Sequence, residues 1–187
     1  MRMSPRLFIF LFIFFTPASL ITVAAAELVM QPAQAQLPMI NEHLHALIRR
    51  LDEKAEGRTG IWQFMVEDRE VMVITDKKVN RMRIIVPIER LDKLSEAQMR
   101  WMLQANFDSV LDARYAIAKE VLWSAYLHPL SSLRDRQFLE GAGQVVNLAA
   151  TFGSSYTSGA LIFRGGDSEG IERRKLIDKL IEKGMAT

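Results

Sequence analysis

The sequence contains no cysteine in its 187 residues. This absence excludes disulfides, zinc ribbons, thiol catalysis and cysteine-bound iron–sulfur clusters. An excess of charge of one sign is also missing, because 24 Lys and Arg residues stand against 22 Asp and Glu residues and the net charge is +2. With no cluster of five or more basic residues, the sequence lacks the electrostatic footprint of a nucleic-acid-binding protein. We therefore expect no nucleic-acid partner.

The N-terminal segment has the pattern of an export signal. Two positive charges lie within residues 1–6, and the 20 residues from Leu7 to Ala26 carry no charge. Small residues precede two sites where a signal peptidase could cut, after Ala26 or after Ala35. This pattern predicts a signal peptide over residues 1–35 and a periplasmic product. An apolar run of this length could also stay uncleaved as an inner-membrane anchor, and only then do we expect contact with a membrane.

The chain beyond residue 35 alternates between helical and strand periodicity. We expect helices over 38–55, from Ser95 onward and from Ser132 to Gly153, because apolar residues recur there at spacings of three and four. Period-two alternation predicts strands over 61–66, 71–75, 82–88, 114–118 and 121–127. The predicted fold class is therefore α+β, an antiparallel sheet in the order α-β-β-β-α-β-β-α, over a domain of residues 36–153. Residues 154–187 are expected to form a loop and a C-terminal amphipathic helix.

The residues that could carry chemistry are few. His43 and His45 lie two positions apart on a predicted helix, which turns their rings about 200° away from each other, and no acidic residue stands at a metal-ligand spacing. We therefore expect no metal site, no cofactor and no catalytic residue. One alternative stays open, a small periplasmic hydrolase or ligand-binding enzyme that would use His128 and a serine of residues 154–158.

A second apolar face of the predicted sheet is a stronger signal. The alternation that buries one set of side chains places Met65 and Ile85 on the opposite face, where Arg81 and Arg83 also point. Solvated charges that discourage edge pairing explain the two arginines equally well. An apolar second face needs a cover, and the predicted partner-binding residues are Met65, Ile74, Arg81, Arg83 and Ile85.

Two segments of the sequence resemble a known family. The run MLQANFDSVLDARYAIAKEVLWSAYLHPLSSL (residues 102–133), together with MRIIVPI (residues 82–88), resembles the YbjN-like group of the type III secretion chaperone-like (Tir-chaperone-like) fold. The resemblance covers about residues 38–153 and contains no catalytic signature. It implies a twisted antiparallel sheet with helices against it, often dimeric, that binds polypeptide segments. The export signal, the near-neutral charge and the extra C-terminal helix depart from secretion chaperones.

These observations predict an exported, noncatalytic protein-binding module, chaperone-like, that recognises a polypeptide segment by apolar burial through the second sheet face and the surface of the helix that begins at Ser95. A protein or peptide segment is the expected partner, and a homodimer is a further expectation. A membrane-anchored structural protein remains a third alternative.

Overall fold

The computed structural model describes residues 37–158 and 168–186, together with their side chains except those of residues 168–172. The elements are α1 (Asn41–Leu51), β1 (Glu56–Arg58), β2 (Ile61–Val66), β3 (Arg69–Asp76), β4 (Arg81–Arg90), the 3-10 turn η1 (Leu91–Lys93), α2 (Glu96–Asp108), β5 (Arg114–Ala118), β6 (Val121–His128), α3 (Asp135–Ala150) and α4 (Ser168–Met185). The expected segment 1–35 lies outside the described residues, as do residues 159–167 of the expected loop.

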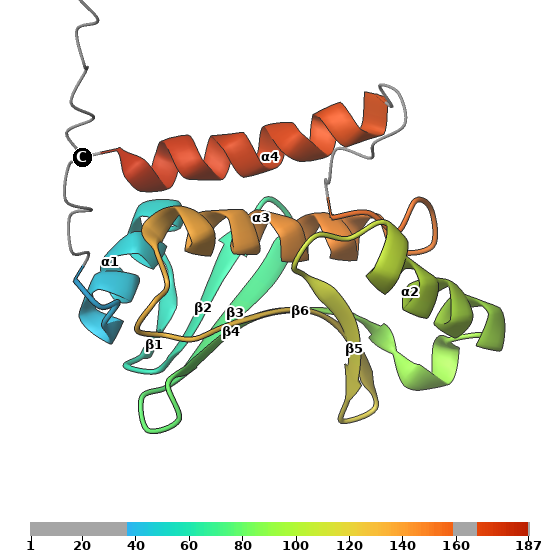
Figure 1. The fold of residues 1–187 in the computed structure, drawn as a ribbon, viewed down its shortest axis with the longest axis horizontal. Coiled ribbons are helices and arrows are strands. Elements are labelled where there is room, and N and C mark those ends of the chain that lie inside the picture. The colour runs from blue at the N-terminus through green and yellow to red at the C-terminus, as the bar shows by residue number, and fades with distance from the viewer. Residues whose placement is uncertain (1–36, 159–167, 187) are drawn as a thin grey trace, which may run out of the picture. The chain divides into compact units, whose positions relative to one another are not determined.

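The six strands form one antiparallel sheet in the order β1-β2-β3-β4-β6-β5. Helices α1 and α3 cover one face of this sheet, and α4 packs on the outer side of both helices (Figure 1). The α+β class and the antiparallel sheet expected from the sequence are therefore confirmed. No helix within residues 37–158 and 168–186 is long and apolar enough to cross a membrane.

The core lies between the sheet and the two helices that cover it. Strand β2 buries Trp62, Phe64 and Val66 and exposes the residues between them, as its alternation predicts. Helix α1 contributes four buried residues at helical spacing, Leu44, Leu47, Ile48 and Leu51. Helix α3 is buried over most of its length because it lies between the sheet and α4.

Two glycines let α3 approach its neighbours closely. A Cβ atom on Gly141 would lie 2.7 Å from the ring of Tyr126 on β6, and one on Gly143 would lie 2.7 Å from Ile177 on α4. This close packing explains why two glycines, which lower helix propensity, stand inside α3. The sequence does not decide whether the C-terminal helix packs on its own chain or on a partner. The contact with Gly143 shows that it packs on its own chain.

The order of elements differs from the prediction at the N-terminal side. The first helix ends at Leu51 rather than near residue 55, and the short strand β1 follows it. Gly57 in β1 has φ of +130°, and a Cβ atom there would collide with the backbone of Ile61. Three exposed residues with a central glycine carry no alternating apolar signal, so periodicity could not find this strand.

Candidate functional site

The second face of the sheet is apolar and has no described helix against it. Its side chains come from alternate positions of four strands, because residues two apart on a strand share a face. We call this surface the open face, and its apolar members are Ile61, Met65, Met72, Ile74, Ile85, Pro87, Trp123, Ala125 and Leu127. In Figure 1 the described helices α3 and α4 lie on the other side of the sheet.

Strand pairing arranges the open face in rows across the sheet. One row joins Ile61, Ile74, Arg83 and Leu127, each paired with the next on the neighbouring strand. The second row joins Gln63, Met72, Ile85, Ala125 and Arg114. Neighbouring strands lie about 4.8 Å apart, so each row brings its members within contact distance and the apolar surface is continuous.

The exposure of these side chains shows that other parts of the described chain leave them uncovered. Leu127 is 59% exposed and Met65 is 48% exposed. Met72, Ile74 and Ile85 are half-buried, and the small side chain of Ala125 is buried. Contiguous exposed apolar patches are uncommon on monomeric proteins and mark interaction surfaces.

All five residues predicted to bind a partner lie on the open face. Ile74 pairs directly with Arg83, and Arg81 pairs with Asp76 at the end of the same strands. Met65 lies on β2, and Ile85 lies in the second row. The structure therefore places these residues on one surface, while their role in binding stays a prediction.

Six further apolar members of the open face were not predicted as site residues: Ile61, Met72, Pro87, Trp123, Ala125 and Leu127. The period-two pattern of residues 121–127 assigns Trp123 and Leu127 to one face, so the signal was present in the sequence. It could not be used, because the pairing of β6 with β4 decides which face of the sheet that is. Pro87 lies beside a bulge between residues 87 and 89 of β4, where alternation is interrupted.

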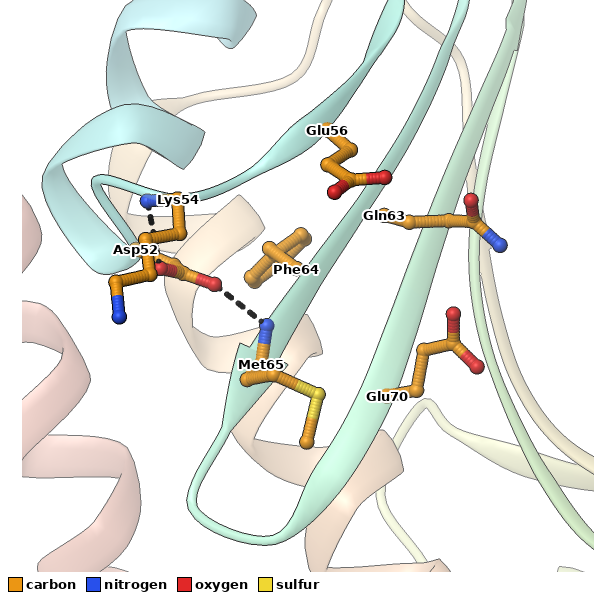
Figure 2. Close-up of a pocket in the computed structure, with 7 residues that line it drawn as sticks. All are labelled: Asp52, Lys54, Glu56, Gln63, Phe64, Met65 and Glu70. Atoms are coloured by element: carbon orange, nitrogen blue, oxygen red, sulfur yellow. Dashed lines mark hydrogen bonds between the residues drawn. The ribbon is translucent and has the colours of Figure 1, made fainter.

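A carboxylate occupies the sheet edge at β2. Beyond the three residues that pair with β1, the backbone N–H of Met65 donates to Asp52 Oδ2 over 2.9 Å, and the N–H of Lys54 donates to Asp52 Oδ1 over 2.9 Å (Figure 2). The hydrogen bond from Met65 is the main cause that lowers the pKa of the Asp52 carboxyl, against a smaller opposing effect of burial. The aspartate takes the place that a carbonyl of a further strand would take.

The hollow beside this edge encloses about 450 Å³ and is lined by Asp52, Lys54, Glu56, Gln63, Phe64, Met65 and Glu70. Figure 2 shows Glu56, Gln63 and Glu70 over the β1–β3 part of the sheet. Three of the lining residues, Asp52, Glu56 and Glu70, are acidic. The hollow therefore forms an acidic end of the open face.

The opposite sheet edge is also occupied by a side chain. Asn106 on α2 accepts the backbone N–H of Tyr115 over 2.8 Å and donates to the carbonyl of Tyr115 over 3.2 Å. The amide group thus makes the two hydrogen bonds that a neighbouring strand would make with β5.

Helix α2 carries a second exposed apolar surface. Phe107 is 91% exposed and Leu103 is 72% exposed, and Trp101 is also exposed. Ile117 on strand β5 is exposed as well. Helical spacing predicts one stripe made of Met99, Met102, Leu103 and Asn106, and for Leu103 this prediction is wrong. Met102, which belongs to the predicted stripe, is buried together with Ala105, since only one narrow side of α2 contacts β5.

In the described residues no hydrogen bond joins His128 to a serine of residues 154–158, the pair that the hydrolase alternative requires: His128 Nδ1 lies 2.8 Å from the carbonyl oxygen of Pro129, and Ser158 Oγ accepts the N–H of Leu111. His128 ends β6 just before α3 begins, while Ser154 and Ser155 follow the end of α3. A helix of 16 residues separates two such points by about 24 Å. Moreover, Ser154 and Ser155 line a hollow with Asp108, Tyr156 and neighbouring residues, and no histidine lines it.

The other histidines make structural contacts. His45 Nδ1 accepts a hydrogen bond from the indole of Trp62 over 3.0 Å, and His43 Nε2 lies 2.7 Å from a carboxylate oxygen of Asp135. Within residues 37–158 and 168–186, no group of three or more His, Asp or Glu side chains could hold a metal ion. The His43–Asp135 pair joins α1 to the start of α3.

Comparisons with known proteins identify similar structures but no family. No family model matches the sequence, and no curated protein matches it. One similar solved structure is a chain of the HopA1–SchA chaperone–effector complex, with 9% identity, a TM-score of 0.45, and 60% of this chain and 94% of that chain covered. Another is a chain of the ExsC–ExsE complex, with 13% identity, a TM-score of 0.44, and coverage of 59% and 91%.

Proposed function

We propose that this chain is an exported, noncatalytic protein-binding module of chaperone-like role, which recognises a polypeptide segment by burying apolar side chains on the open face. The observation that carries the proposal is the uncovered face itself, with Ile74 and Ile85 at its centre and Leu127 at its side. Burial of apolar surface contributes about 25 cal/mol per Å². A segment that covers these rows would therefore bind without any covalent chemistry.

The open face is suited to binding because it is held rigidly from behind. Strands β3, β4 and β6 each pair on both sides, and α3 packs on their other face. A preformed surface loses little conformational entropy on binding. The chaperone-like role rests on this surface and on the sequence resemblance described above.

A photocrosslinking residue at Leu127 tests the proposal in cells that express the chain. We expect crosslinked adducts with a protein partner. We expect these adducts to disappear when Ile85→Asp places a charge in the second row. Met185→Asp is the matched control, because it introduces the same charge at an exposed apolar position on α4, on the other side of the sheet. Circular dichroism establishes that both variants fold.

Two results would remove the proposed face. The first is an unchanged set of adducts in Ile85→Asp, and the second is loss of the adducts in Met185→Asp alone. A homodimer is the other expected assembly, and a second copy crosslinked at Leu127 would show that the open face is a self-association surface. Sedimentation velocity of the purified protein distinguishes that result from capture of a different protein.

A further inference from the structure

We infer that the occupant of the open face is an amphipathic helix that carries a carboxylate, rather than an extended strand. This inference rests on the proposed function and specifies the partner of the same surface. The inference follows from three features: the side chains on the face of the sheet, the backbone groups at its edges, and the positions of its charged residues.

The face of the sheet offers side chains only. Strands β3, β4 and β6 have a hydrogen-bonded neighbour on each side, so their backbone groups are already used in the sheet. An extended segment lying flat on this surface would bury N–H and C=O groups without partners, and each such group costs more than a typical hydrogen bond gains. A helix satisfies its backbone groups internally, so it can cover the apolar rows without that cost.

The edges of the sheet are poorly suited to strand addition. Recognition by an added strand needs a row of free backbone groups at an edge. Where β2 extends beyond β1, the backbone N–H of Met65 is already bonded to Asp52. At the β5 edge, the backbone N–H and C=O of Tyr115 are already bonded to Asn106. β1 itself has three residues, too few for a stable ladder.

The opposite face demonstrates that this sheet accepts a helix. Helix α3 packs across β3, β4, β5 and β6 from behind. On the open face, the two rows of side chains cross the same strands, β3, β4 and β6. The three spacings from β2 to β6 amount to about 14 Å, which matches the width of one helix with its side chains.

The two arginines supply the charge requirement. Arg83 lies between Ile74 and Leu127 in its row, and Arg81 lies two positions before it on β4. Both are exposed, and no ion pair within residues 37–158 and 168–186 includes either of them. Asp76, opposite Arg81, uses Oδ1 to accept the backbone N–H groups of Lys78 and Val79. A carboxylate on the bound helix would complete this cationic end.

The charges also give the helix a direction along the strands. Met72 pairs with Ile85, so Glu70 lies level with Pro87, six residues along β4 from Arg81. Six residues of strand span about 20 Å, which equals about 13 residues of helix. We therefore expect acidic residues at one end of the bound helix, near Arg81 and Arg83, and basic or neutral residues at the end near Glu70.

Selection of random 20-residue peptides by the purified protein tests the inference, with Leu127→Asp as the counter-selected variant. Leu127 is 59% exposed, so this substitution leaves the core unchanged. We expect enriched peptides with apolar residues at spacings of three and four and with Asp or Glu at one end. The double variant Arg81→Glu, Arg83→Glu should bind such a peptide at least about ten-fold more weakly and should select Lys or Arg instead.

Arg100→Glu is the matched control, because Arg100 is exposed on α2 and pairs with Glu96. It should leave the selected sequences unchanged. Enriched peptides with period-two alternation, a charge preference that the double variant does not alter, or no enrichment over Leu127→Asp would each overturn the inference. If one of these results occurred while Ile85→Asp still abolished crosslinking at Leu127, the inference would fail and the proposed function would stand. A dimer that Ile85→Asp dissociates would overturn the inference, since a second copy would then be the occupant.

Discussion

The side chain of Asn106 on α2 bonds both the N–H and the C=O of Tyr115 on β5. It thus takes the place of one residue of a neighbouring strand. The donor and acceptor of one side-chain amide match the N–H and C=O of one residue, over 2.8 Å and 3.2 Å. This pair fixes α2 to the sheet, and it also blocks the edge of β5 against other chains.

Replacement of Asn106 by Ala should destabilise the protein by about 1–3 kcal/mol, because two backbone groups of Tyr115 lose their partners. The freed edge should also promote self-association. Urea unfolding measures the first effect, and sedimentation velocity at increasing protein concentration measures the second. Gln104→Ala, at an exposed position of the same helix, should change neither. Equal stability of the two variants would contradict the role assigned to Asn106.

Asp52 should make a pH-dependent contribution to stability. The N–H of Met65 and other neighbours hold the pKa of the Asp52 carboxyl below its ordinary value of 3.8. A group whose pKa is lower in the folded state than in the unfolded state stabilises the fold above the unfolded pKa, and this contribution is lost as the pH falls through the folded pKa. The stabilisation should therefore be complete at neutral pH, decline as the pH falls past 3.8, and disappear below the lowered pKa of the folded state.

The substitution Asp52→Asn tests this expectation. At pH 7 we expect a loss of about 1 kcal/mol, the typical contribution of one hydrogen bond. The difference in free energy of unfolding between the original protein and the variant should shrink as the pH is lowered past 3.8. Urea unfolding between pH 2.5 and pH 7 measures it. A difference that stays constant over this range would show that the carboxylate charge is not involved.

Much of the fold follows from local patterns in the sequence. Strand β2 spans Ile61–Val66 as alternation predicts, because one of its faces is covered and the other is open. The capping box at the start of α2 is also observed, with Ser95 and Gln98 each bonding the backbone of the other. Lys119 and Glu120, the two residues left between the predicted strands 114–118 and 121–127, form a hairpin turn. Both have positive φ, as two-residue hairpins of this type require.

The occupied sheet edges could not be predicted, because they depend on contacts between distant parts of the chain. Asp52 and Met65 are 13 positions apart, and neither lies in a motif that indicates the other. The open face was predicted in part, since Met65 and Ile85 follow from alternation alone. Its other half depends on the pairing of β4 with β6, which joins residues about 40 positions apart and has no local signal.

The N-terminal residues carry a prediction that peptide chemistry can check. If residues 1–35 are a signal peptide, protein recovered from the periplasm should begin at Glu27 or at Gln36. Mass spectrometry of the intact protein and N-terminal sequencing distinguish the two starts. Protein that retains residue 1 and fractionates with the inner membrane would instead support the anchored alternative.

Helix α4 should depend on Gly143 for its position against α3. A Cβ atom there would lie 2.7 Å from Cγ1 of Ile177 and 3.2 Å from its Cα atom, so the two helices must separate or Ile177 must move. Overpacking of this kind costs about 1–3 kcal/mol, which outweighs the gain of about 1 kcal/mol in helix propensity when Ala replaces Gly. We expect Gly143→Ala to lower the free energy of unfolding and to make α4 more sensitive to limited proteolysis.

The double variant Gly143→Ala, Ile177→Ala separates the steric effect from other causes. Ile177 is buried, so Ile177→Ala alone should cost about 2–5 kcal/mol through the cavity it leaves. Because the methyl group introduced by Gly143→Ala would fill part of that cavity, the double variant should be more stable than the sum of the two single effects predicts. Strict additivity in urea unfolding would show that the close approach of α3 and α4 does not depend on these two side chains.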